Sequence, residues 1–247
     1  HYLAAQGEIP EMIVVAVTST VRVRDFTQSD WSSHWVGGGG AANFRRFLSA
    51  ELIPQIEKNY RTDGYRVLSG HSAGAQFALY CLGEQPALFR AYFALAPSLD
   101  WDDNLPQRSL RKSLTSIASP KGFLYVARAD DYDRALDDYN SLVQTLREHA
   151  PPGLHWDSQA FPDETHVSLP LLGQIAALRS LYQGYRYHDM AGKDLAFAER
   201  HYQQVSMRIG KTIAVPEGVI NELGYEALSQ GRTGDAISLF KRNVAAN

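Results

Sequence analysis

The sequence predicts an α/β fold with a mainly parallel sheet, helices on both faces and a helical appendage at the C-terminal end. Three observations support this fold class. Short apolar runs alternate with helical spacing over about 180 residues. One apolar run leads through a Gly-framed serine directly into a helical pattern. From about Tyr187 onward only helical patterns remain.

The first predicted strand covers residues 12–17, a β-branched-rich run typical of a strand buried on both faces of a parallel sheet. Apolar residues then recur at helical spacing from Phe44 to Tyr60. A second apolar run at residues 65–69 leads into the serine turn. These segments predict one β-α-β unit.

The alternation continues along the chain. It predicts strands near residues 91–96, 122–127 and 154–161, a polar loop over residues 100–106, and a helix with Ala135, Tyr139, Leu142, Val143 and Leu146 on one face. Strands that alternate with helices form a parallel sheet with right-handed crossovers. We expect residues 1–186 to form this domain, with its first strands lying upstream of His1 in a truncated N-terminal part.

The C-terminal segment, residues 187–247, predicts helices over residues 194–207, 217–230 and 233–244. Its pattern from Leu223 to Phe240 resembles one helix-turn-helix unit of the tetratricopeptide type. A single repeat cannot cover its own apolar face. We therefore expect these helices to pack on the main domain, on further repeats or on another subunit, through a protein partner or self-association.

Composition limits the classes of binding partner that the chain is expected to have. The formal net charge of −3 and the pI near 6.3 indicate neither a nucleic-acid nor an anionic-membrane partner. No apolar run has the roughly 18 residues needed to span a bilayer. The single cysteine, Cys81, has apolar neighbours, which favours a buried inert thiol. The sequence does not distinguish a cytoplasmic from a periplasmic location. We expect the partner to be a small-molecule substrate.

The segment Gly70-His71-Ser72-Ala73-Gly74 is the most informative motif. A strand, a sharp turn that carries serine, and a helix together make a nucleophile elbow. We expect glycine at 70 and 74 to leave room where a side chain would collide with neighbouring backbone. The motif predicts a serine hydrolase with Ser72 as nucleophile.

A serine hydroxyl needs a base within hydrogen-bond reach, usually histidine. His166 fits best because it lies in a polar loop directly after the last predicted strand. Other histidines fit less well as the base. His155 lies within a predicted strand, and three more lie on or beside predicted helices: His149, His188 and His201. His71 lies in the elbow itself, where we expect its side chain to pack rather than react.

The acid that would orient His166 is expected after the strand near residues 122–127. Asp131 is the first choice and Asp130 the second. Asp133, Asp163, Glu164 and a dyad without an acid remain open. The same carboxylates would also suit a solvated helix N-terminus, where the helix dipole favours negative charge.

Charge that builds on a substrate carbonyl oxygen needs pre-aimed donors, and the backbone N–H of Ala73 is one. The second normally comes from a loop after an earlier strand, so we expect it upstream of His1. The sequence contains no Cys pair, no H-E-x-x-H and no set of His and carboxylates at ligand spacing. We therefore expect no metal and no cofactor.

Several ordered motifs carry a family resemblance from Gly7 to about Tyr185. They are Ile9-Pro10-Glu11-Met12-Ile13-Val14-Val15, Arg24-Asp25-Phe26-Thr27, Gly39-Gly40-Ala41-Ala42-Asn43-Phe44, the elbow, Ala96-Pro97-Ser98-Leu99-Asp100-Trp101 and Glu164-Thr165-His166. In this stretch the chain resembles the putative esterase family of α/β hydrolases, which includes esterase D and bacterial esterases of trilactone siderophores.

The resemblance implies an α/β-hydrolase fold, with Ser72 as nucleophile, His166 as general base and Ala73 as backbone donor. It implies a pocket rimmed by residues 22–25 and 98–101. Arg24, His71 and Trp101 are the candidate substrate-binding residues, although an ion pair with Asp25 would equally explain Arg24. Trp31, Trp35 and residues 37–40 suggest either a flap over the site or a surface loop.

Two departures from the family pattern stand out. No glycine-acid pattern marks the strand-end acid, so the resemblance is also compatible with a Ser-His dyad of the kind found in some siderophore esterases. Asp100 stands where the family has the first Trp of its pocket segment.

These observations predict hydrolysis of a carboxylic ester through an acyl-enzyme on Ser72, with a siderophore-type lactone or a thioester among the candidate substrates. Two alternatives remain. The same acyl-enzyme would serve an acyltransferase. The second alternative is a non-catalytic, hydrolase-like scaffold with a protein-binding helical tail.

Overall fold

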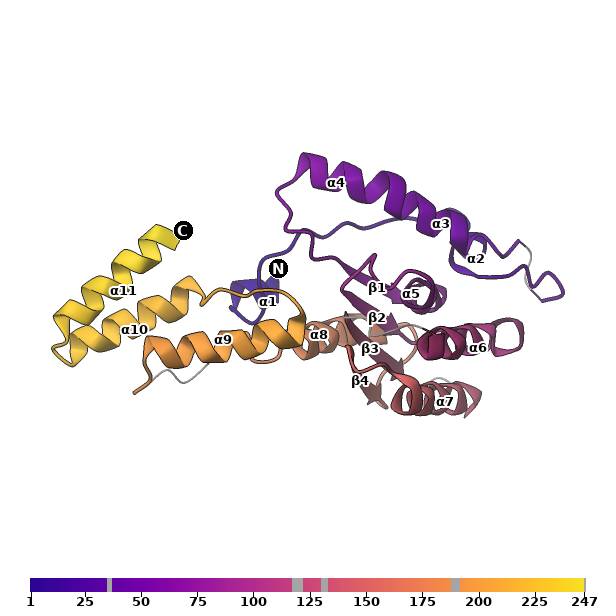
Figure 1. Ribbon diagram of the computed structural model, residues 1–247. Helices are drawn as coiled ribbons and strands as arrows, with labels where there is room; N and C mark the ends of the chain where they lie inside the picture. The colour runs from indigo at the N-terminus through magenta and orange to yellow at the C-terminus, as the bar shows by residue number, and fades with distance from the viewer. Residues whose placement is uncertain (35–36, 117–121, 130–132, 188–191, 247) are drawn as a thin grey trace. The chain divides into compact units, whose positions relative to one another are not determined.

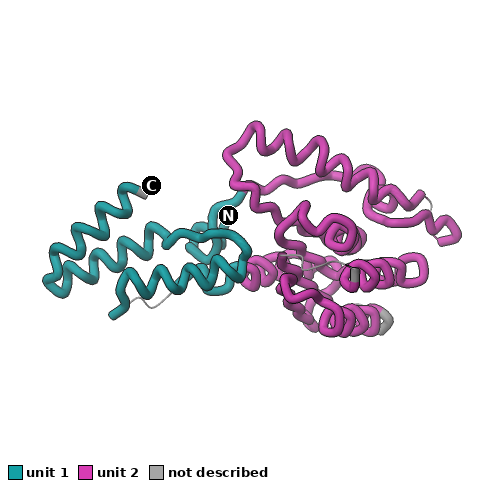
Figure 2. The backbone as a smooth tube through the Cα atoms, viewed as in Figure 1, with its two compact units in different colours: residues 1–12, 182–247 teal, residues 13–181 magenta. Residues whose placement is uncertain are grey.

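The computed structural model describes residues 1–34, 37–116, 122–129, 133–187 and 192–246. The chain divides into two compact units (Figure 2). The larger one is Ile13–Leu181, and the smaller one combines His1–Met12 with the residues from Tyr182 onward. The division into residues 1–186 and 187–247 stays a prediction.

The larger unit is built on a four-stranded sheet in the order β1-β2-β3-β4. Its strands are β1 (Val67–His71), β2 (Ala91–Leu95), β3 (Gly122–Ala129) and β4 (Leu154–Phe161). All three pairs are parallel, and the register sets His71 beside Leu95 and Leu95 beside Ala127. Since each strand is followed by a helix, the predicted alternation is confirmed for these four strands.

Helices lie on both faces of this sheet (Figure 1). Helix α5 (Ala73–Glu84) contacts β1 and β2, and α6 (Trp101–Ser116) and α7 (Asp133–His149) complete that layer. Helix α8 (Leu169–Leu181) packs on β2, β3 and β4 from the other side. A Cβ at Gly173 of α8 would lie 3.2 Å from Leu95 Cδ2, so this helix sits directly on the side chain that ends β2.

The core lies between the sheet and the helices. Every residue of β2 is buried, as expected for a central strand of a parallel sheet. Cys81 of α5 is fully buried, and this burial raises the pKa of its thiol. The predicted buried cysteine is thereby confirmed.

The helical pattern from Phe44 to Tyr60 is also confirmed. Helix α2 (Arg22–Phe26) precedes α3 (Ala41–Phe47), the π-helical turn η1 (Leu48–Leu52) and α4 (Ile53–Asn59). The N–H of Ile53 donates to Leu48 O, the wider spacing of a π-turn. Pro54 follows directly in the first turn of α4, where its lack of an N–H is tolerated.

The predicted strand at residues 12–17 is wrong. This segment has no regular secondary structure, and Val14 is 70% exposed. An extended run forms a strand only when neighbouring backbone pairs its N–H and C=O groups. Among the described residues, β1 pairs with β2 and no strand lies on its other side, so the run has no ladder to join.

The predicted polar loop over residues 100–106 is partly wrong, because α6, which is assigned from Trp101, is regular helix by the end of this range. Within its first turn, Asp102, Asp103 and Asn104 have left-handed backbone conformations with φ of 47°, 54° and 58°. The regular helix therefore starts after Asn104. Pro106 then falls in its first turn, a position that proline favours.

The smaller unit is helical. It contains α1 (Tyr2–Ala5), α9 (Leu195–Ile209), α10 (Glu217–Ser229) and α11 (Thr233–Ala246), which confirms the three predicted C-terminal helices. Helices α10 and α11 pack closely, because Gly224 lies directly beneath the ring of Phe240. The amide of Asn243 donates to Asn221 Oδ1 at 2.9 Å across the same interface.

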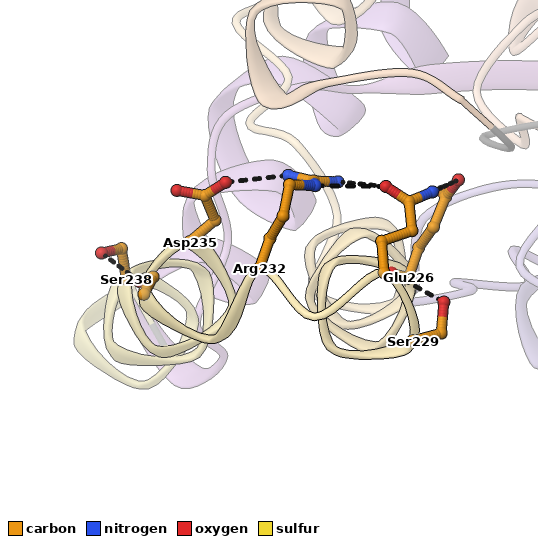
Figure 3. A network of polar contacts seen from close by, with 7 residues as sticks. Glu226, Ser229, Arg232, Asp235 and Ser238 are labelled. Atoms are coloured by element: carbon orange, nitrogen blue, oxygen red, sulfur yellow. Dashed lines mark hydrogen bonds and ion pairs between the residues drawn. The ribbon is translucent and has the colours of Figure 1, made fainter.

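A polar network holds the turn between α10 and α11 (Figure 3). Arg232 forms an ion pair with Asp235 at 2.9 Å and donates to Gln230 Oε1. Gln230 in turn donates to Glu226 Oε1, which also accepts the N–H of Gly192. The tetratricopeptide resemblance of this helix pair stays a prediction. None of the described helices is long and apolar enough to cross a membrane.

Candidate active site

Ser72 occupies the turn between β1 and α5, at the carboxyl end of the sheet. Its backbone has φ 59° and ψ −122°, a conformation that L-residues rarely adopt. Such a residue costs on the order of 1–3 kcal/mol, which the surrounding structure must supply. Strain of this kind at a serine after a strand is what a nucleophile elbow predicts.

The two glycines of the elbow have different roles. A Cβ at Gly70 would lie 2.0 Å from the carbonyl oxygen of Gly74, a distance that no side chain tolerates. A Cβ at Gly74 would meet nothing within 4 Å. The expected collision is therefore confirmed at Gly70, where the backbone of Gly74 and Ala75 fills the space, and wrong at Gly74, where a Cβ would meet open space.

Two hydrogen bonds fix Ser72 to the end of the neighbouring strand. Its N–H donates to Leu95 O at 3.0 Å, and its carbonyl accepts the N–H of Ser98 at 3.4 Å. The Ser72 hydroxyl lies 3.4 Å from the Ser98 hydroxyl. The nucleophile candidate is thus positioned by β2 and the segment that follows it.

His166 lies in the loop between β4 and α8. Thr165 and Ser168 form a local turn there, in which the Thr165 N–H donates to Ser168 Oγ at 2.9 Å and the Leu169 N–H to Thr165 O at 3.0 Å. These bonds begin α8 and hold the loop from its C-terminal side. His166 is half-buried, as a base that must meet both serine and substrate should be.

The structure brings His166 beside the elbow. The ring centroids of His71 and His166 are 4.4 Å apart with an interplanar angle of 48°. Since His71 directly precedes Ser72, this contact brings the predicted base against the residue that adjoins the predicted nucleophile. His71 therefore packs against His166, and the expectation that His71 does not itself react stays a prediction.

Ala73 is the first residue of α5. The first N–H groups of a helix have no partner within it and point toward the positive end of the helix dipole. When Ser72 Oγ bonds to an acyl carbon, the negative charge on the former carbonyl oxygen would develop next to the N-terminus of α5. Ala73 therefore keeps its assignment as a candidate oxyanion donor.

The two preferred candidate acids follow β3 in the sequence. Asp130 and Asp131 lie outside the described residues. Asp163, one of the alternatives, is exposed in the loop that carries His166. Within the described part of the chain, no cluster of three or more His, Cys, Asp or Glu side chains is arranged to hold a metal ion.

Thr27 organises the glycine-rich segment. It is 1% exposed, its hydroxyl donates to Val23 O at 2.7 Å, and it accepts the N–H of Gly39 at 3.1 Å. A Cβ at Gly38 would lie 2.3 Å from Ser29 O, and one at Gly40 would lie 2.7 Å from Arg24 O. The glycines therefore permit close backbone approach to the Arg24-Asp25-Phe26-Thr27 motif. Trp35 lies outside the described residues.

Trp101 borders the same segment. It is 6% exposed, its indole N–H donates to Ser29 Oγ at 3.1 Å, and it meets Trp31 edge to face at 5.3 Å. A Cβ at Gly38 would lie 3.0 Å from its ring. Trp101 is thus fixed between the glycine-rich segment and Trp31, a rigid aromatic wall at the start of α6.

Arg24 and Asp25 form an ion pair. Arg24 Nε lies 2.7 Å from Asp25 Oδ1, and the Ser19 hydroxyl donates to the other carboxylate oxygen at 2.7 Å. The hydrogen bond from Arg24 lowers the pKa of Asp25, against a smaller opposing effect of burial. It also raises the pKa of Arg24. The ion-pair interpretation of Arg24 is present in the structure, while the guanidinium stays about half exposed.

This pair predicts a pH-dependent stability. Because the folded-state pKa of Asp25 is depressed, its stabilisation is present above the unfolded-state value of about 3.9 and is lost as pH falls through the folded-state value. We expect Asp25→Asn to lower the free energy of unfolding at about pH 6 and to have a smaller effect near pH 3. Urea unfolding of both proteins at the two pH values measures this. An equal loss of unfolding free energy at both pH values would contradict this prediction.

Residues 1–154 match the putative esterase family. The chain belongs to this family. The ferri-bacillibactin esterase BesA of Bacillus subtilis is 30% identical over 67% of this chain. The chain spans 65% of the length of that relative.

Solved structures agree with the family assignment. An IroE-like serine hydrolase from Shewanella oneidensis is 26% identical, with a TM-score of 0.85 over 100% of this chain and 83% of that one. The BES protein from Bacillus cereus is also 26% identical, with a TM-score of 0.62 over 72% of this chain and 74% of that one. The esterase-family resemblance and the α/β-hydrolase fold are thereby confirmed.

The sequence did not single out Ser98 or Thr27 as individual residues. Both lie inside motifs shared with the esterase family, and this was the only signal available. Their roles depend on contacts between segments far apart in the chain: Ser98 with Ser72, and Thr27 with Gly39. Periodicity along the sequence carries no information about such contacts.

Proposed function

We propose that this member of the esterase family hydrolyses a carboxylic ester through an acyl-enzyme on Ser72. The observation that carries the proposal is the strained serine of the elbow with His166 packed beside the adjoining His71. Strain at this serine has a cost in stability, and presenting a hydroxyl at the carboxyl end of the sheet is its expected benefit.

The reaction would proceed in two halves. Ser72 Oγ attacks the ester carbonyl while His166 accepts its proton, and the oxyanion is stabilised by the N–H of Ala73. The C–O bond to the leaving group breaks, and His166 returns the proton to the alkoxide. Water then gives a proton to His166 and attacks the acyl carbon. The bond from the acyl carbon to Ser72 Oγ breaks, His166 returns the proton to Ser72 Oγ, and the acid is released.

We propose Asp131 as the carboxylate that orients His166, with Asp130 as the second choice and a Ser-His dyad as the alternative. A second oxyanion donor is part of the same proposal. We further propose an ester of the siderophore-lactone type as substrate, since the relative from Bacillus subtilis is named a ferri-bacillibactin esterase. Trp101 and the exposed guanidinium of Arg24 are the proposed substrate contacts, together with His71. Association through the C-terminal helices also stays a proposal.

A fluorophosphonate tests the nucleophile, because it reacts with an activated serine and remains attached. We expect the intact mass of the protein to increase by one label, and Ser72→Ala to remain unlabelled. Ser238→Ala serves as a matched control, since this exposed hydroxyl bonds only locally to Gly234 O in α11. It should label like the unmodified protein.

The outcomes separate the candidate functions. Labelling that persists in Ser72→Ala would overturn the assignment of the nucleophile, and an unlabelled parent protein would favour the non-catalytic scaffold. Given labelling at Ser72, product analysis with added alcohols distinguishes hydrolysis from acyl transfer. Free acid as the sole acyl product supports the esterase.

A further inference from the structure

The chain makes an unusual turn where β2 ends. Ala96 has φ 44°, in the left-handed region that a residue with a Cβ rarely adopts, and its N–H donates to Ala127 O at 2.8 Å. Among the described residues, Ala96 and Ser72 are the two non-glycine residues with positive φ that directly follow a strand. Two neighbouring parallel strands therefore finish in strained residues on the same edge of the sheet.

The turn at Ala96 brings Ser98 to the elbow. The Ser98 N–H donates to Ser72 O at 3.4 Å, and the Ser98 hydroxyl lies 3.4 Å from Ser72 Oγ. The backbone N–H and the side-chain hydroxyl of Ser98 therefore both contact Ser72. Leu99, which follows, is 3% exposed and belongs to the hydrophobic core, so the segment is anchored directly beyond Ser98.

A structural requirement for the Ser98 hydroxyl is hard to find. The backbone N–H already fixes the segment to the elbow, and the side chain of Leu99 fixes it to the core. The side chain of Ser98 is only half-buried, so its hydroxyl has no need of a protein partner to offset desolvation. What the hydroxyl adds is a hydrogen-bond donor next to the oxygen that would react.

We propose that Ser98 is a further catalytic residue, whose hydroxyl donates a hydrogen bond to Ser72 Oγ during attack. This inference rests on the proposed nucleophilic role of Ser72. As the Ser72 proton moves to His166, negative charge grows on Ser72 Oγ until the bond to the acyl carbon forms. The Ser98 hydroxyl stabilises that charge and keeps its own proton throughout.

The separation of 3.4 Å is longer than the 2.5–3.0 Å typical of hydroxyl hydrogen bonds. Hydrogen bonds in a resting active site are often long and shorten as charge develops. A bond to an ionised oxygen is both shorter and stronger than a neutral one. The contact is therefore weak in the resting state and strongest during attack, which is the condition for raising kcat rather than lowering KM.

Three variants test the role of Ser98: Ser98→Ala, Ser98→Thr, which keeps the hydroxyl, and the Ser238→Ala control. We expect Ser98→Ala to lower both kcat and the rate constant of fluorophosphonate labelling by about tenfold. KM should change less than about twofold, and the thermal midpoint should stay close to that of the parent protein. Ser98→Thr should recover most of the labelling rate.

Parent-like labelling and turnover in Ser98→Ala would overturn the inference, as would a folded Ser98→Thr no faster than Ser98→Ala. If the threonine variant does not fold, the alanine variant decides alone. Failure of the proposed function gives a different result, because the parent protein would then not label, or would still label in Ser72→Ala.

Discussion

Replacing Ser72 by alanine is expected to lower kcat for ester hydrolysis by about 10³- to 10⁶-fold. The physical reason is the loss of the covalent acyl-enzyme, which divides one difficult displacement into two easier steps. The residual rate would come from the Ala73 N–H and from binding, which Ser72→Ala leaves in place. Steady-state kinetics on an activated aryl ester measures the loss, with the thermal midpoint as a check on folding.

The companion experiment uses His166→Ala and the double variant. Residues that act as one catalytic unit are strongly non-additive, so the double variant should be about as slow as the slower single variant. His155→Ala is a matched control, because His155 is an exposed histidine on β4 that the proposed mechanism does not use. It should retain parent activity. Independent, additive losses at Ser72 and His166 would argue against a nucleophile–base pair.

Replacing Gly70 by alanine is expected to lower the free energy of unfolding by roughly 3 kcal/mol or more. The added Cβ would lie 2.0 Å from Gly74 O and 2.2 Å from Gly74 C. Both are backbone atoms in the first turn of α5, so no side-chain rotation can relieve the contact. Either the turn opens, which displaces Ser72, or the helix shifts against the sheet. Urea unfolding monitored by circular dichroism gives the loss.

The second glycine of the motif provides the control. A Cβ at Gly74 meets nothing within 4 Å, and alanine is favoured over glycine within a helix by about 1 kcal/mol. We therefore expect Gly74→Ala to unfold within about 1 kcal/mol of the parent protein. Equal destabilisation by the two substitutions would refute the assignment of different roles to these glycines.

The sequence was most informative where structure is determined locally. The strands of the sheet and the helices between them follow from short apolar runs that alternate with helical spacing, and residues 154–161 match β4 at both ends. The same rule failed at residues 12–17, which have the composition of a buried strand but no pairing partner among the described residues. Composition sets the tendency to extend, whereas hydrogen bonding to a neighbour decides whether a strand forms.

The candidate site shows the same limit. Ser72 could be proposed as nucleophile because the elbow is a contiguous motif, and His166 as base because it lies in the loop after the last predicted strand. The contact of Ser98 with Ser72 could not, since it depends on the backbone of Ala96, whose side chain gives no hint of a left-handed conformation. The absence of a steric need at Gly74 was equally hidden, because it reflects what surrounds that residue in space.

The packing of α8 on the sheet connects the proposed nucleophile and the proposed base through one residue, Leu95. Leu95 accepts the N–H of Ser72 on its carbonyl, and its side chain faces Gly173 of α8. His166 stands three residues before that helix begins. A side chain larger than glycine at position 173 would press on Leu95, so this position, which is neither the proposed nucleophile nor the proposed base, would affect the spacing between the two through the packing of α8 on β2.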